Sequence, residues 1–254
     1  MTPPAQARIE RTATISDRVA ALDWNGIAQT LDAQGVVTTG PLLSAQDCAD
    51  MRAVYDHEET FRSHIIMGRH GFGRGEYKYF QYPLPDLVEQ LRVSLYPRLA
   101  PIANAWTAML SGGSGSAAAP STFPAELTAY IDLCHEAGQT RPTPLLLKYV
   151  AGDYNCLHQD LYGAHVFPLQ VAIVLSDPRS DFDGGEFVVV EQRPRMQSRA
   201  EVVIPSLGEA VIFAVHHRPV QGSKGPYRVN LRHGVSRIRS GQRLTLGVIF
   251  HDAL

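Results

Sequence analysis

A series of short apolar runs, separated by turn residues, fills the chain after Pro142. The runs are rich in β-branched and aromatic residues and have the length of single strands. Turn residues separate them, as in Asp183-Gly184-Gly185 and Ser240-Gly241-Gln242. Strands at this close spacing are typical of sandwiches and barrels, and a double-sheet jelly roll fits the pattern. The expected strands cover residues 145–150, 169–175, 186–190, 201–204, 210–215, 227–231 and 244–250.

The first half of the chain has helical spacing instead. Apolar residues recur with a helical period over residues 17–33, 87–110 and 124–137. Pro97 and Pro101 should interrupt or kink the helix in which they lie. These patterns predict helices that precede the strands and support them.

Between these helices the pattern is less regular. Ser44 is a suitable N-cap for a further helix that runs to residue 55, and residues 36–38 should form a short strand. Residues 61–82 look irregular and are rich in Gly, His and aromatic residues, which allows a lid. The Gly-, Ser- and Ala-rich residues 111–121 should form a mobile loop.

Together these patterns predict a single α+β domain, with N-terminal supporting helices and a jelly-roll core. We expect a disordered tail at residues 1–12, mainly helical support with the possible lid at residues 13–140, and the jelly-roll core at residues 141–254. Oligomeric state does not follow from these patterns.

Composition limits the class of protein. The chain has 254 residues, of which 44% are hydrophobic and 19% charged, as in ordinary globular proteins. No apolar run is long enough for a membrane span, and the first residues do not read as a signal peptide. Three widely separated cysteines, Cys48, Cys134 and Cys156, argue against a disulfide framework or a structural zinc site. These features favour a cytoplasmic protein.

A His-x-Asp motif, His158 and Asp160, follows the first expected strand. On an extended backbone residues i and i+2 point the same way, so the two side chains can converge on one point. With a second histidine they would form the two-His, one-carboxylate triad that binds non-haem Fe(II) and leaves coordination positions open. The motif alone also fits a surface turn. The candidates for the third ligand are His165, His216, His217, His233 and His251.

His233 is the favoured third ligand, because it lies at the end of an expected strand; His216 is its main rival. Arg243 opens the last expected strand, and a turn at Ser240-Gly241 would bring it back near His233. A guanidinium there can bind a carboxylate through two hydrogen bonds. The Arg243 guanidinium would suit the distal carboxylate of a dicarboxylic cosubstrate such as 2-oxoglutarate. The alternative is that Arg243 lies in water at the end of the strand or in a surface ion pair.

This set of residues resembles the Fe(II)/2-oxoglutarate-dependent dioxygenase superfamily, whose fold is the double-stranded β-helix, a jelly roll. The resemblance covers residues 145–251 and rests on the His-x-Asp motif, residues 183–186, His233 and Arg243. It implies an enzyme that uses Fe(II), 2-oxoglutarate and O2 to hydroxylate a C–H bond. The implied metal ligands are His158, Asp160 and His233.

Two branches of the superfamily are matched in part. Tyr149, nine residues before His158, holds the place of a tyrosine that contacts 2-oxoglutarate in AlkB-type nucleic-acid demethylases; a core aromatic is the alternative reading. Ile249 stands where those enzymes have a second arginine, which departs from their pattern. The ten-residue spacing from His233 to Arg243 is instead similar to the spacing in prolyl-hydroxylase-type enzymes. The whole chain most resembles a bacterial group of oxygenases for which repair of alkylated DNA has been proposed.

Charge is unevenly distributed in a chain whose net charge is −2. Residues 210–251 contain no Asp or Glu but several arginines, and cations alternate with aromatic residues in residues 61–82. Such patterns can bind phosphates and stack bases, although a solvated face is the plain alternative. We expect Arg218, Lys224 and Arg228 in a loop at residues 217–227 near the site mouth. The nucleic-acid contacts expected are Arg62, Arg69, Arg74, Lys78, Arg218 and Lys224.

Three functions fit the sequence. The first is oxidative demethylation of alkylated nucleic acid. The second is hydroxylation of a protein side chain, as in prolyl hydroxylases, or of a small molecule. The third is a non-catalytic jelly-roll binding or sensor protein that has kept the pocket.

Overall fold

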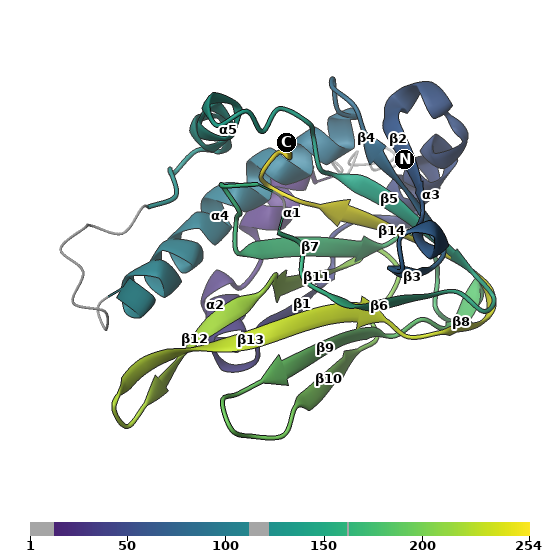
Figure 1. The fold of residues 1–254 in the computed structure, drawn as a ribbon. Helices are drawn as coiled ribbons and strands as arrows, with labels where there is room; N and C mark the ends of the chain where they lie inside the picture. Colours follow the sequence, from purple (N-terminus) through teal and green to yellow (C-terminus); the bar gives the residue numbers. More distant parts are fainter. Residues whose placement is uncertain (1–12, 112–121, 162) are drawn as a thin grey trace, which may run out of the picture.

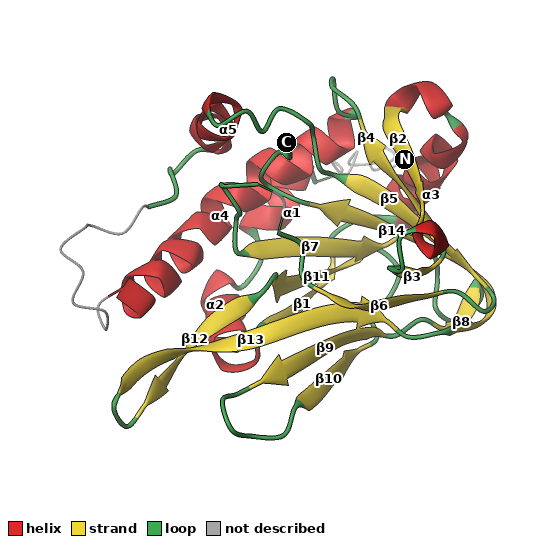
Figure 2. Cartoon of the chain, in the orientation of Figure 1, coloured by secondary structure: helices red, strands yellow, loops and turns green. Residues whose placement is uncertain are grey.

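The computed structural model describes residues 13–111, 122–161 and 163–254 (Figure 1). Two antiparallel sheets lie face to face, and the long helix α4 (Asp86–Ser111) runs along the outer side of the larger sheet (Figure 2). This is the predicted jelly roll with supporting helices. The expected disordered tail and nearly all of the expected mobile loop lie outside the described residues.

The larger sheet combines strands from both halves of the chain. Its last strand, β14, pairs with β5 on one side and β7 on the other, so the end of the core sequence lies between two strands from its beginning. A short strand, β8 (Phe182–Gly184), pairs with the beginning of β14. The strand order is β1 (Val36–Pro41), β11 (Glu209–Ala214), β7 (Leu169–Val174), β14 (Ile238–Val248), β5 (Leu145–Val150), β4 (Glu76–Phe80) and β2 (Phe61–Ile66).

The smaller sheet carries the His-x-Asp motif. Strand β13 is its centre and pairs with both β9 and β6. The strand order is β10 (Arg199–Val203), β9 (Phe187–Gln192), β13 (Gly225–Val235), β6 (Tyr154–His158) and β3 (Gly73–Arg74), and β12 (His217–Gly222) forms a hairpin with β13.

The helices differ in two places from the expected ones. The helix expected over residues 17–33 is two helices, α1 (Ile15–Ala20) and α2 (Trp24–Gln34), because the Asp23 side chain accepts a hydrogen bond from the Gly26 N–H and starts a new helix. Pro97 and Pro101 do not interrupt α4, because its buried apolar face outweighs two lost backbone hydrogen bonds. Helix α5 (Leu127–Glu136) forms where expected.

Ser44 caps α3 (Ala45–Ala53) as predicted. Its hydroxyl accepts from the Asp47 N–H at 3.1 Å, and the Asp47 carboxylate accepts from the Ser44 N–H at 2.8 Å, which is a complete capping box. Three single turns of 3₁₀ helix follow α3 along the chain, at Val54–Asp56, Glu58–Thr60 and Met67–Arg69.

Three expectations for the irregular segments are wrong. Residues 61–82 contain the strands β2, β3 and β4, and β4 extends the larger sheet beside β5. Residues 217–227 form a hairpin instead of a loop. The turn before Arg243 lies between Val235 and Ile238, and Ser240-Gly241 lies inside β14. In each segment Gly, Pro or charged residues broke the apolar alternation from which a strand is predicted.

Apolar residues alternate across the strands, so one face of the larger sheet packs on helices and the other lines the interior of the sandwich. In β5, Leu146 belongs to the main core with Leu91 and Leu95 of α4, whereas Leu145 and Tyr149 belong to a second cluster between the sheets. No helix among the described residues is long and apolar enough to cross a membrane.

Candidate functional site

A cavity of about 230 Å³ lies between the two sheets, at the level of the His-x-Asp motif. Strands β5, β7 and β14 of the larger sheet form one wall, and β6 and β13 of the smaller sheet form part of the other. Most of the lining is apolar or aromatic. The polar side chains that reach it include Asn155, His158, Gln159, Asp160, Gln170, His233, Arg243 and Thr245.

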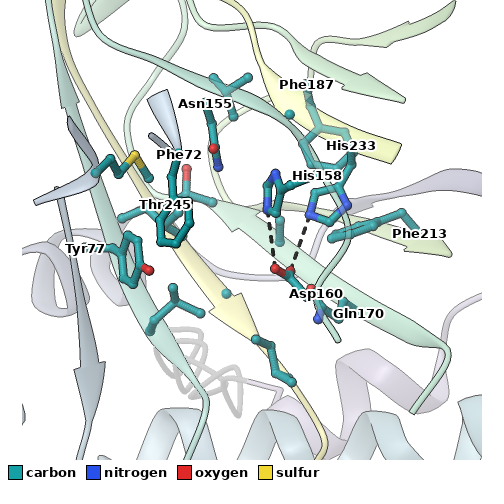
Figure 3. A pocket seen from close by; sticks show the side chains of 18 of the residues that line it. Phe72, Tyr77, Asn155, His158, Asp160, Gln170, Phe187, Phe213, His233 and Thr245 are labelled. Carbon is teal, nitrogen blue, oxygen red and sulfur yellow. Dashed lines mark ion pairs between the residues drawn. The ribbon is translucent and has the colours of Figure 1, made fainter. Parts of the chain in front are cut away.

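His158, Asp160 and His233 converge in this cavity. Their ligand atoms all lie within 4.8 Å of one another. His158 ends β6 and is paired in register with His233 of β13, and Asp160 follows in the loop after β6. Each Nε2 atom lies 3.4 Å from an Asp160 oxygen, and Figure 3 shows the three side chains pointing toward one another. The sheet pairing therefore assembles three donors that could hold one metal ion.

The charges of the three groups are coupled. Burial opposes ionisation of Asp160, but contacts with the two histidines hold the pKa of its carboxyl well below the usual range. Burial alone would lower the pKa of His158, but Asp160 and the Cys156 carbonyl oxygen raise it overall. Burial lowers the pKa of His233. The Nδ1 atom of His158 donates to the Cys156 carbonyl at 2.8 Å, which directs Nε2 into the cavity.

The other histidine candidates lie away from this cluster, because among the described residues only His233 joins the pair. His216 stacks edge-on against His217, and neither lines the cavity. The buried His251 accepts a hydrogen bond from the Phe167 N–H at 3.2 Å. His165 makes backbone contacts with Gln139.

Arg243 lies further along the same cavity. It is paired in register with Tyr149 of β5, and its guanidinium lies 5.8 Å from the centre of the Tyr149 ring. Arg243 is 2% exposed, and burial lowers its pKa to about 10. Its Nε atom has no hydrogen-bond partner, and no carboxylate of the described residues forms an ion pair with it. A buried cation without a counterion is costly, which fits an anionic ligand in the cavity.

The Thr245 hydroxyl and the Gln170 amide nitrogen are also buried in the cavity lining without a partner. Together with Arg243 they leave hydrogen-bonding capacity unused in an apolar cavity, where such capacity usually has a ligand. The donor set therefore fits both groups implied by the sequence. Two imidazoles and a carboxylate suit Fe(II), and the guanidinium suits the distal end of a dicarboxylate.

The segment Asp183-Gly184-Gly185-Glu186 makes room for Arg243. A Cβ atom on Gly185 would lie 3.0 Å from Arg243 Cδ and 2.3 Å from the Ile238 side chain, so only glycine allows this close approach. Arg239 binds both oxygens of Asp183, at 2.7 and 2.9 Å, and one oxygen of Glu186 at 3.0 Å. These ion pairs fasten the segment to the beginning of β14.

Gln159 is a residue that the sequence reasoning did not identify. Its amide donates to the backbone carbonyls of His216 at 3.0 Å and Leu231 at 2.7 Å. Leu231 lies two residues before His233 on β13. The middle residue of the His-x-Asp motif thus ties the motif to the strand of the third histidine. No pattern in the sequence signals this role, because both acceptors are backbone atoms.

The expected nucleic-acid contacts divide into buried and exposed groups. Lys78 and Arg218 are wrong as contacts, because each is at most 3% exposed. Lys78 is paired with Glu58, and Arg218 with Glu191, both at 2.5 Å. Arg62 is half-buried and donates to the Pro142 carbonyl. Arg69, Arg74 and Lys224 are exposed.

Comparisons with known proteins place the chain. Residues 75–253 match the family model Oxygenase-NA, described as "Oxygenase, catalysing oxidative methylation of damaged DNA". The uncharacterised proteins MT2286 and Rv2227 of Mycobacterium tuberculosis are each 49% identical over 174 residues, which are 68% of this chain and 72% of theirs.

Solved structures share the fold at low identity. A Pseudomonas putida prolyl-4-hydroxylase matches with a TM-score of 0.51 and 13% identity, over 91% of this chain and 99% of its own. The non-haem α-ketoglutarate-dependent epimerase SnoN matches with a TM-score of 0.52 and 14% identity, over 88% of this chain and 80% of its own. The chain therefore belongs to the Oxygenase-NA family, and it is an oxygenase on the Fe(II)/2-oxoglutarate jelly-roll fold with a His-Asp-His triad able to bind iron.

Proposed function

We propose that this oxygenase removes N-alkyl groups from damaged nucleic acid by oxidation. The observation that carries the proposal is the triad beside an unpaired buried arginine, in a chain whose family is described as acting on damaged DNA. Hydroxylation of an N-methyl carbon gives an unstable product that loses formaldehyde and leaves the unmodified base. Each turnover consumes one 2-oxoglutarate and one O2 and yields succinate and CO2.

The site residues have separate roles in this proposal. His158, Asp160 and His233 hold Fe(II), and Arg243 binds the distal carboxylate of 2-oxoglutarate with Tyr149 beside it. Iron, when bound, supplies the activation of O2 and the oxidation. The chain positions the reactants: the sheet pairing places the two histidines opposite each other, and the apolar lining keeps water from the reacting atoms.

The partner contacts are proposed from exposure. Arg69, Arg74 and Lys224 can reach a phosphate backbone, and Arg62 can do so after modest rearrangement of its side chain. The cytoplasm is the proposed location, which the absence of disulfides between Cys48, Cys134 and Cys156 supports.

A second candidate is hydroxylation of a protein side chain or a small molecule. The ten-residue spacing from His233 to Arg243 favours it, because prolyl-hydroxylase-type enzymes have this spacing. The family description favours the first candidate.

Turnover on a panel of substrates separates the two. The protein is supplied with Fe(II), O2 and 2-oxoglutarate, and succinate is measured with methylated oligonucleotides, proline-containing peptides and small metabolites. We expect succinate formation stimulated by a methylated oligonucleotide. Stimulation by a peptide alone would establish the second candidate and refute the first.

The metal-ligand roles are tested by binding. We expect His233→Ala to weaken anaerobic Fe(II) binding severely, whereas His216→Ala, which removes the rival histidine, should leave it unchanged. Equal affinity of His233→Ala and the parent would refute the third ligand.

A further inference from the structure

Phe72 is an aromatic residue at the rim of the cavity that the roles above do not use. It lines the cavity, and it is also 48% exposed, so it lies where the cavity opens to solvent. Figure 3 shows its ring across the cavity from His158 and His233. Single exposed apolar residues are common, so the position alone indicates no function. The backbone around Phe72 and its neighbours add the necessary information.

The backbone of Phe72 is held on both sides. Its N–H donates to the Met67 carbonyl at 3.3 Å, and its carbonyl accepts from the Cys156 N–H at 2.9 Å. The next residue, Gly73, begins β3 and pairs with β6, and a Cβ atom there would lie 2.5 Å from the Tyr154 carbonyl oxygen. Phe72 therefore directly precedes a strand that pairs with the strand of His158. Its backbone is held before any substrate arrives, which lowers the entropy cost of binding.

The neighbours of Phe72 are aromatic and cationic. The His70 ring stacks on it, with centroids 5.3 Å apart and an interplanar angle of 21°. Arg69 and Arg74 lie on either side of it in the sequence and are exposed, and the Arg74 side chain is 70% exposed although its Nε lies 3.4 Å from Asp153. An aromatic surface between cations suits a stacked base whose phosphates lie on either side.

We propose that Phe72 stacks on the alkylated nucleobase and holds it in the mouth of the cavity, with the alkyl group directed toward the triad. The inference rests on the proposed function and adds which residue selects the substrate. Stacking of this kind needs a base that is unpaired, so the ligand class is a single-stranded or flipped-out nucleotide. The cavity therefore selects a flat heteroaromatic ring in an anionic chain.

The test compares Phe72→Leu, which removes the flat ring, with Phe72→Trp, which keeps one. The substrate is a single-stranded oligonucleotide with one N-methylated base, and the full chain is used with Fe(II), O2 and 2-oxoglutarate. We expect Phe72→Leu to raise the KM for the oligonucleotide at least about tenfold, as loss of a base stack does. Phe72→Trp should stay near the parent. The affinity for 2-oxoglutarate should be unchanged in both.

Tyr154→Leu is the matched control. Tyr154 is 40% exposed on the neighbouring strand but does not line the cavity, so its loss should not change the KM. A parent-like KM for Phe72→Leu overturns the stacking role. So does a loss of 2-oxoglutarate affinity in that variant, or a Phe72→Trp variant as impaired as Phe72→Leu. These outcomes leave the proposed function standing, whereas a parent that neither binds nor oxidises any methylated oligonucleotide refutes the proposed function itself.

Discussion

At the scale of residues, the triad shows how proton and metal binding compete for the same atoms. Without metal, the raised pKa of His158 and the lowered pKa of Asp160 describe an ion pair between them. Fe(II) binding requires that His158 lose its proton, whereas Asp160 is already ionised. His233, whose pKa burial lowers, is already neutral near pH 7.

The affinity for Fe(II) should therefore decrease as the pH is lowered. As the pH drops from 8 to 6, His158 becomes protonated first because its pKa is raised, and the Fe(II) affinity should decrease by up to about tenfold per pH unit below that pKa. Anaerobic titration calorimetry between pH 8 and pH 6 measures the Fe(II) affinity. A constant affinity from pH 8 to 6 would contradict the ion pair between His158 and Asp160.

Gln159 provides a second residue-scale prediction. Gln159→Leu keeps the volume of the side chain but removes both hydrogen bonds to the backbone carbonyls of His216 and Leu231. We expect Fe(II) affinity to fall about tenfold, as for other residues that orient metal ligands. Gln221→Leu is the control, because Gln221 is an exposed glutamine on β12 whose side chain donates to the Gly222 carbonyl and does not line the cavity. Unchanged affinity and an unchanged Co(II) spectrum in Gln159→Leu would show that the bonds do not position the ligands.

At the scale of elements, β14 brings two of the polar side chains into the cavity. It carries Arg243 and Thr245, and its first residues pair with β8. Gly241 lies in that stretch with φ of 78°, where a Cβ atom would be 2.0 Å from the Asp181 carbonyl oxygen. The strand can follow this path only with glycine at position 241.

Gly241→Ala and Gly40→Ala separate the steric clash from backbone strain. Gly40 has nearly the same φ, 77°, but nothing lies within 4 Å of a Cβ atom there. Gly40→Ala should cost about 1 kcal/mol of unfolding free energy, from the left-handed backbone alone. Gly241→Ala should cost at least about 3 kcal/mol, because the clash adds to the strain. Urea denaturation measures the unfolding free energy of both variants. Equal losses would contradict the steric clash, because they would mean that the segment before β8 shifts to accommodate the added methyl group at little cost.

The strands and the site residues differ in how far the sequence predicts them. The convergence of the triad residues, and the place of Arg243 in the same cavity, could be predicted because residue type and order along the chain point to them, although only the strand register brings them together. Strand β6 was missed because its residues are mostly exposed and show no apolar alternation. The burial of Lys78 and Arg218 was missed because Glu58 and Glu191 are 20 and 27 residues away in sequence and meet them only after the sheets form.

At the scale of the whole molecule, α4 packs on the outer side of the larger sheet, whereas the cavity lies between the two sheets. The exposed cations Arg69 and Arg74 lie on the segment that contains the cavity-lining Phe72 and pairs with β6. Arg98 is exposed on α4, on the helical side of the larger sheet. A nucleic acid that reaches the triad should therefore contact the first pair and not Arg98.

Salt dependence tests this orientation. Affinity for single-stranded DNA should fall with salt, and Arg69→Gln and Arg74→Gln should each reduce the slope of log affinity against log salt by about 0.7. Arg98→Gln should leave the slope unchanged. Fluorescence polarisation over a salt series measures it, and an equal effect of all three substitutions would indicate non-specific attraction.

Oxidative demethylation releases one formaldehyde for each succinate formed. Both products are measured from one reaction of the full chain with Fe(II), O2, 2-oxoglutarate and a single-stranded oligonucleotide that carries one N-methylated base. We predict equal amounts of the two products, and neither above background with Asp160→Ala. Succinate without formaldehyde, or no stimulation by any methylated oligonucleotide, would contradict an oxygenase that demethylates nucleic acid.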